Sequence, residues 1–68
     1  METRHEIARK YGYKLRSSLY GDFLSQGTGD DLMKIDNKNE IIVYAHDANA
    51  YFVASLVRNT PRSEPCQN

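Results

Sequence analysis

The fold of this chain is decided by the stretch IARKYGYKLRSSLYGDFLSQ, Ile7–Gln26. It contains two glycines, Gly12 and Gly21, at positions that would interrupt a long helix. Its apolar residues recur every four positions, which would also suit one continuous helix over residues 4–26. A strict period of four drifts around a helix, however, and Gly12 would lie unsupported in its middle. The better interpretation is two short helices joined by a turn.

The first helix is predicted over about residues 4–11. Thr3 and Glu6 have the spacing of a capping box, which satisfies the free amides where a helix begins. Gly12 follows at the position where a left-handed residue ends a helix at low cost. The second helix is predicted to begin near Arg16 and to include Gly21, at a cost of about 1 kcal/mol relative to alanine.

The rest of the chain predicts a hairpin and a third helix. After the loop GTGDD, residues 27–31, the segments DLMKI and EIIVYAH read as strands joined by the polar turn DNKN. Asp47 is predicted to cap a helix with the sequence ANAYFVASLVRN, whose buried face would carry Tyr51, Phe52, Ser55 and Leu56. The apolar residues expected to share one core are Tyr11, Leu15, Leu19, Phe23, Ile42, Tyr44, Phe52 and Leu56.

Length and charge favour binding over catalysis. A chain of 68 residues forms one thin core, with little room for a deep catalytic pocket. The net charge is zero, but residues 1–20 hold five basic side chains against two acidic ones. Residues 21–47 hold six acidic against two basic. A basic first third is compatible with a surface that faces phosphates.

Domain limits and location are also predicted from composition. The segment TPRSEPCQN, residues 60–68, contains two prolines and is expected to be a disordered tail after one domain of residues 1–59. The single cysteine, Cys66, argues against a disulfide-stapled secreted protein. The charged start and the lack of a long apolar run predict a cytoplasmic protein without a membrane span.

With this order of elements, the chain resembles the excisionase-like, MerR-like winged helix-turn-helix domains of phage and bacterial regulators. The resemblance covers residues 3–57. It is carried by Thr3, Glu6-Ile7-Ala8, Gly12, Arg16-Ser17-Ser18-Leu19-Tyr20, Gly27, the hairpin, Asp47 and Ala50-Tyr51-Phe52. It implies a small α+β fold in the order helix, helix, β-hairpin, helix.

The resemblance also implies a function: a DNA-binding regulator of transcription, or an excisionase-like factor that sets the direction of recombination. The second helix would enter the major groove of double-stranded DNA, with Arg16 contacting guanine. The residues expected to bind DNA are Arg9, Lys10, Lys14, Arg16, Ser17, Ser18, Tyr20, Lys34 and Lys38. Few phosphate contacts would then call for a homodimer, cooperative assembly on DNA, or a protein partner such as an integrase, polymerase or host factor.

Structural roles remain as alternatives for several of these residues. Ser17 or Ser18 is as well suited to capping the second helix. Surface lysines are commonly only solvated, and Asp36–Asn39 suits a turn by its geometry alone. A different function also stays open: a phage- or plasmid-type inhibitor or adaptor that binds protein through the acidic segment of residues 21–47.

The sequence gives little support for catalysis. Neither histidine, His5 or His46, has a cysteine or carboxylate at the spacing of a metal site. The loop Gly27–Gly29 lacks the lysine of a phosphate-binding loop. We therefore expect no enzyme activity, no metal and no cofactor.

Overall fold

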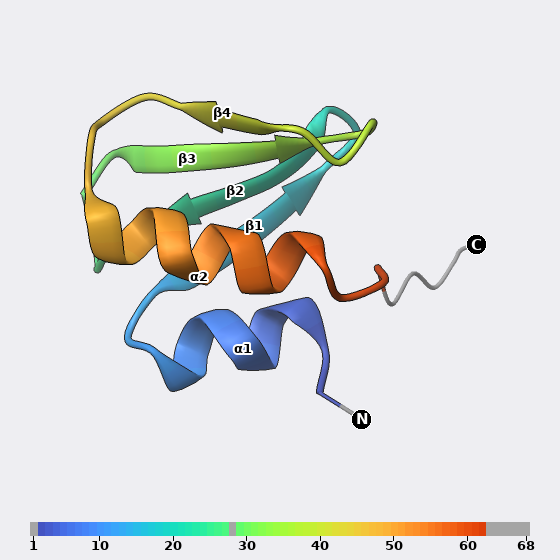
Figure 1. Cartoon of the computed structure of the whole chain (residues 1–68), viewed down its shortest axis with the longest axis horizontal. Helices are drawn as coiled ribbons and strands as arrows, with labels where there is room; N and C mark the ends of the chain where they lie inside the picture. The colour runs from blue at the N-terminus through green and yellow to red at the C-terminus, as the bar shows by residue number, and fades with distance from the viewer. Residues whose placement is uncertain (1, 28, 63–68) are drawn as a thin grey trace.

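The computed structural model describes residues 2–27 and 29–62, and it shows a four-stranded antiparallel sheet with both helices on one face (Figure 1). The strands follow one another across the sheet in the order β1-β2-β3-β4. The elements in chain order are α1 (Arg4–Lys10), β1 (Lys14–Ser18), β2 (Gly21–Ser25), β3 (Asp31–Asp36), β4 (Ile41–Val43) and α2 (Ala48–Arg58).

The predicted second helix is wrong. The chain from Lys14 to Ser25 forms the hairpin β1–β2, in which Ser18 lies opposite Gly21. The arrangement is therefore helix, four strands, helix, and it is not a winged helix-turn-helix. The α+β composition stands, but the helix expected to enter the major groove does not exist.

Gly21 is the residue whose role reverses between the predicted and the observed fold. Its φ angle is +136°, outside the range of a helix, and an added Cβ atom would lie 2.5 Å from the carbonyl oxygen of Ile35. Only glycine lets β2 approach β3 this closely. The residue that looked like a tolerated flaw in a helix is therefore required by the sheet.

The first helix and its end are confirmed. The Thr3 hydroxyl accepts from the amide of Glu6, and the Glu6 carboxylate accepts from the amide of Thr3, so the capping box is complete. Gly12 has a φ of +89°. The amide of Tyr13 donates to the carbonyl of Ala8 at 2.8 Å, which gives the helix a Schellman end. This end turns the chain directly into β1.

The hairpin β3–β4 and the cap of the last helix are confirmed as well. The carboxylate of Asp36 accepts from the amides of Lys38 and Glu40, which holds the turn, and Asn39 takes a left-handed φ of 66°. Asp47 accepts from the amide of Ala50 at the start of α2. Both segments were read correctly because their signals are local.

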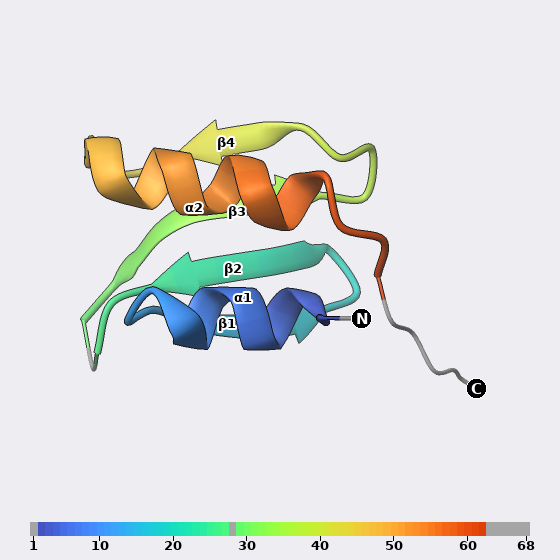
Figure 2. The same cartoon turned by 60° about the horizontal axis from the view of Figure 1, so that its bottom comes forward.

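The predicted core is wrong in most of its members. The buried apolar side chains are Ile7, Ala8, Tyr13, Leu24, Met33, Ile35, Ala50, Val53, Ala54 and Val57. Of the eight residues expected in the core, Leu15 and Leu56 are partly buried against it, none is fully buried, and Leu19 is 87% exposed. The predicted buried face of α2 is also wrong, because Tyr51 and Phe52 are about half exposed. Helix α2 buries alanines and valines instead, which lets it pack closely against α1 and the sheet. Figure 2 shows the two helices side by side on that face, α1 beside β1 and α2 beside β3 and β4.

A buried ion pair joins the helices to the sheet. The Arg4 guanidinium lies 2.9 Å from the Asp22 carboxylate of β2, and both side chains are 4% exposed. Arg4 also donates to two backbone carbonyls at the end of α2. One is that of Arg58, the last residue of the helix, at 3.4 Å, and the other is that of Thr60, two residues later, at 2.6 Å. A further bond goes to the side chain of Asn39 in the β3–β4 turn. One side chain thus connects four segments.

The end of the described chain packs against the sheet. Arg62 donates to the carbonyl of Asp36 and to the side chain of Asn37, and its Nε lies 3.7 Å from Asp22. The predicted disordered tail began at residue 60, and its residues 63–68 lie outside the described residues. Within the described chain, no helix has the length and apolar content that crossing a membrane requires.

We expect Gly21→Ala to lower the free energy of unfolding by about 3 kcal/mol or more, through backbone strain and the clash with Ile35. In a helix the same change would stabilise the protein by about 1 kcal/mol. The matched control is Gly12→Ala, because no atom lies within 4 Å of a Cβ added at Gly12. Only the left-handed backbone should then contribute, and it should lower the free energy of unfolding by about 1–2 kcal/mol. Urea unfolding followed by circular dichroism measures both. A stabilised Gly21→Ala variant would contradict the hairpin.

We expect Arg4→Met to lower the free energy of unfolding by about 3–5 kcal/mol, because the buried Asp22 carboxylate loses its hydrogen-bonded partner and keeps only the Arg62 Nε at 3.7 Å. Such a loss is comparable to the whole stability of a chain this small, roughly 3–10 kcal/mol. The double variant Arg4→Met/Asp22→Leu should recover about 2 kcal/mol or more relative to the sum of the single changes. Lys10→Met, which removes an exposed pair with Glu2, is the control and should change stability by under about 1 kcal/mol. Additivity in the double variant would exclude coupling between Arg4 and Asp22.

Candidate functional site

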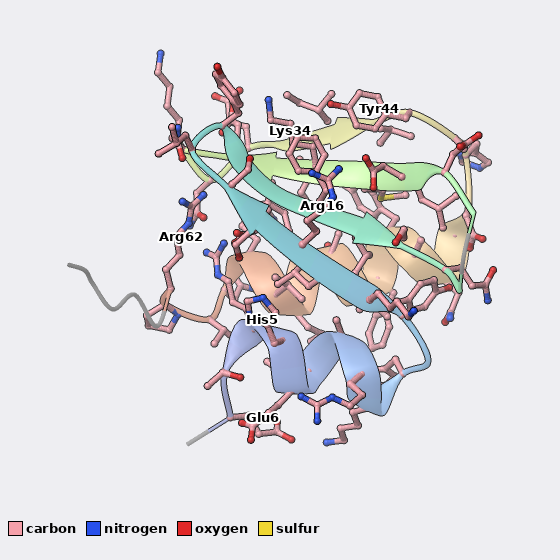
Figure 3. All side chains as sticks on the ribbon, turned by 180° about the vertical axis from the view of Figure 1, so that it is seen from behind. His5, Glu6, Arg16, Lys34, Tyr44 and Arg62 are labelled. Atoms are coloured by element: carbon pink, nitrogen blue, oxygen red, sulfur yellow. The ribbon has the colours of Figure 1, made fainter. Side chains whose placement is uncertain are left out.

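The face of the sheet that the helices leave uncovered is the candidate site, and we call it the open face. Successive side chains of a strand point to opposite faces, so burial of Leu15 and Leu24 against the helices turns their neighbours outward. The register places four such neighbours in one row across the strands: Arg16, Phe23, Lys34 and Ile42. Figure 3 shows Arg16, Lys34 and Tyr44 on this face, with α2 behind the sheet and α1 below it in the view. Together with Tyr44, and with Lys14 two residues before Arg16 on β1, the residues of this row make up the open face.

Two cations stack on an aromatic ring at the centre of the open face. The Arg16 guanidinium carbon lies 4.4 Å from the centroid of the Phe23 ring, and the Lys34 Nζ lies 5.4 Å from it. Arg16 also bonds the carboxylate of Asp31 at 2.7 Å. Its side chain nevertheless remains 60% exposed. Arg16 is therefore held in a defined position with its charge available to solvent.

The two edges of the open face differ in chemistry. Lys14 and Arg16 give the β1 edge its charge, whereas Ile42 and Tyr44 make the β4 edge apolar. The amide of Tyr44 donates to the carbonyl of Leu32 at 2.9 Å, so the backbone that carries this ring is tied to β3. The ring itself stays 53% exposed. The face is thus cationic on one side and aromatic on the other.

Acidic groups reduce the positive charge of the open face without cancelling it. Asp31 faces Arg16, and Asp36 ends the strand that carries Lys34. The backbone hydrogen bond from Glu40 is the main cause that lowers the pKa of Asp36 below its ordinary value. Desolvation opposes it, and the backbone hydrogen bond from Lys38 and the charges of Lys34 and Lys38 lower the pKa further. The Asp36 carboxylate is therefore charged at neutral pH and is directed at its own turn.

Three of the nine predicted DNA-binding residues meet on the open face: Lys14, Arg16 and Lys34. Arg9 and Lys10 lie on α1, on the opposite side of the sheet, where Lys10 Nζ is 3.6 Å from the Glu2 carboxylate. The helical surface on which these groups were expected to converge is absent, because residues 14–25 are strands.

The remaining predicted residues lie at turns or against α1. The Ser18 hydroxyl donates to the carbonyl of Gly21 and accepts from the amide of Tyr20, so it stabilises a hairpin turn and does not cap a helix. Tyr20 is exposed in this turn, and Lys38 lies in the turn between β3 and β4. A hydrogen bond from the Asn37 side chain to the carbonyl of Leu19 joins the two turns at 2.8 Å.

Ser17, which was predicted to bind DNA, faces α1 and not the open face. Its hydroxyl shares a hydrogen bond of 3.4 Å with Nε2 of His5, on the exposed rim between α1 and β1. Among the described residues no group of three histidine, cysteine or acidic side chains is placed to hold a metal ion. A serine and a histidine alone lack the orienting third group that activates a nucleophile.

Sequence reasoning missed the apolar part of the site. Phe23, Ile42 and Tyr44 were all assigned to the core. Phe23 and Ile42 lie in the row of the open face, and Tyr44 lies beside them. The segment EIIVYAH is apolar on both faces of its strand, so alternation could not tell which side is buried. The site could have been identified from the two cations that flank Phe23, Arg16 on β1 and Lys34 on β3. That step requires the register of β1, β2 and β3, which the sequence alone does not supply.

The acidic segment of residues 21–47 is distributed among structural contacts. Asp22 pairs with Arg4, Asp31 pairs with Arg16, and Asp36 and Asp47 accept from backbone amides. Glu40 and Asp30 are exposed.

Comparisons with protein families, curated proteins and solved structures found no match.

Proposed function

We propose that the protein binds DNA through the open face of its sheet. The observation that carries the proposal is the row Arg16–Phe23–Lys34, in which two cations are held beside an aromatic ring on a face without helices. Cations of this kind neutralise phosphates and release counterions, which drives binding to nucleic acid. Aromatic and apolar groups next to them supply contacts to bases.

The sheet takes the place of a recognition helix in this proposal. Both helices pack against the opposite face, so they leave the open face accessible along β1–β4. Arg9 and Lys10 on α1 are a weaker alternative, because Glu2 and Glu6 lie beside them and Lys10 pairs with Glu2. A field of mixed sign attracts phosphate poorly.

The expected affinity is modest. Lys14, Arg16 and Lys34 provide about three phosphate contacts, which correspond to a slope of roughly −2 to −3 in log affinity against log salt. Asp31 and Asp36 reduce the local field further. Occupancy in the cell then rises when neighbouring copies bind together along the same DNA.

We expect Arg16→Gln/Lys34→Gln to weaken DNA binding about tenfold or more at about 50 mM salt, and to lower the salt slope by roughly 1.5, because two phosphate contacts are lost. The matched control is Arg9→Gln/Lys10→Gln, which removes the same charge from the helical side. It should change affinity by no more than about twofold. Fluorescence anisotropy with labelled DNA at several salt concentrations measures both quantities.

Two results would overturn the proposal. One is a wild-type protein that shows no salt-dependent binding to any DNA at about 50 mM salt. The other is an equal loss in the two double variants, which would mean that only net charge matters.

We expect Asp31→Asn to tighten DNA binding about threefold at low salt, since the substitution removes a negative charge from the face and keeps an oxygen that can accept from Arg16. The gain should shrink as salt rises. Asp30→Asn, which removes the same charge one residue earlier, is the control and should have a smaller effect. Weaker binding by Asp31→Asn in the anisotropy assay would show that its charge is needed to hold Arg16 for DNA.

A further inference from the structure

We infer that the open face takes a single DNA strand, with its phosphates over β1 and its bases toward β4. This inference rests on the proposed function and specifies the form of DNA and its orientation. It follows from the asymmetry of the face: Lys14 and Arg16 lie on the β1 edge, and Ile42 and Tyr44 lie on the β4 edge.

The width of the sheet argues against a duplex. Neighbouring strands lie about 4.8 Å apart, so the axes of β1 and β4 are separated by roughly 14 Å before side chains are added. The major groove is about 12 Å wide and admits a helix or a two-stranded ribbon. A four-stranded face of this kind lies across a duplex instead of entering its groove. A single strand, in contrast, follows a sheet face without such a limit.

The aromatic edge argues for unpaired bases. Inside a duplex the faces of the bases are covered by their neighbours, and only base edges are offered to a protein. A single strand exposes base faces, which stack on aromatic rings with little dependence on sequence. The ring of Tyr44 is 53% exposed, and Ile42 beside it is 38% exposed. Tyr44 is therefore the stacking platform in this arrangement.

The cationic edge suits the phosphates of an extended strand. Lys14 and Arg16 lie two residues apart on β1, about 6.8 Å along the strand. Successive phosphates of a nucleic-acid strand that runs along β1 can therefore meet these two cations in turn. Lys34, on β3, lies between the charged and the aromatic edges.

Phe23 is a positioning residue in this site. Its ring lies under both Arg16 and Lys34, so a base reaches it only after these cations move. Its role is to hold the Arg16 guanidinium, whose carbon lies 4.4 Å from the centroid of the Phe23 ring, in a fixed place on the open face. Phe23→Leu should therefore lower affinity and salt slope together through Arg16, whereas Phe23→Tyr should restore both.

The experiment compares three probes that differ in one property each. An oligothymidylate of about 12 nucleotides offers phosphates and free bases. An abasic strand of the same length offers the phosphates alone. A duplex of the same length offers phosphates with its bases stacked. We expect the oligothymidylate to bind about tenfold or more tightly than either of the others at the same salt concentration.

Substitution of Tyr44 gives a second, independent readout. Tyr44→Ala should weaken oligothymidylate binding about tenfold with an unchanged salt slope, because stacking releases no counterions. Tyr44→Phe should retain affinity. Tyr51→Ala removes an aromatic ring of similar exposure from α2 and should have no effect. The chain has no tryptophan, so Tyr44→Trp introduces a single reporter whose fluorescence a stacked base should quench.

The outcomes separate this inference from the proposed function. Salt-dependent binding that is equal for the oligothymidylate and the abasic strand, or stronger for the duplex, overturns the single-strand inference and leaves DNA binding by the open face standing. Lack of binding to all three probes overturns both. Loss of binding in Tyr44→Ala with no quenching in Tyr44→Trp would also contradict base stacking at this position.

Discussion

The fold depends on one buried contact, the ion pair between Arg4 and Asp22. Withdrawing two charges from water is costly, and it is offset here because Arg4 directs further donors to Thr60, Asn39 and Arg58. The arginine comes from the start of α1, and its acceptors come from β2, the β3–β4 turn and the end of α2. In a chain with so thin a core, this contact ties both helices to the same face of the sheet.

Both helices cover the same face of the sheet and leave the open face uncovered, and the candidate site lies on that open face. Small residues on the buried side of α2, among them Ala50 and Ala54, allow close packing on the covered face. The larger rings of Phe23 and Tyr44 are thereby left on or beside the open face. Arg16 stacks on the partly buried Phe23 ring and still offers its own charge to solvent. The same contact serves the solubility of the sheet and the proposed recognition of DNA.

Sequence signals between neighbouring residues predicted the helix caps and the β3–β4 turn correctly. Contacts between residues far apart in the sequence could not be predicted from it. The capping box at Thr3, the turn held by Asp36 and the cap at Asp47 each involve residues a few positions apart, and each is present in the structure. The hairpin β1–β2 was mistaken for a helix because its apolar residues have the i, i+1, i+4, i+5 spacing of a helical stripe: Leu19, Tyr20, Phe23 and Leu24. The deciding fact, the approach of Gly21 to Ile35, joins residues far apart in sequence. A buried arginine gives no pattern at all.

The site was therefore half predicted, and for a reason that the register explains. Arg16 and Lys34 were selected as DNA-binding cations, but on a helix and on a separate wing. Two steps of antiparallel pairing, Arg16 with Phe23 and Phe23 with Lys34, bring them together over one ring. A shift of one residue in either pairing would turn Phe23 toward the helices and separate the cations. The chemistry of the open face is thus a property of strand register, and Gly21, by allowing β2 to approach β3, is one of the residues that fixes it.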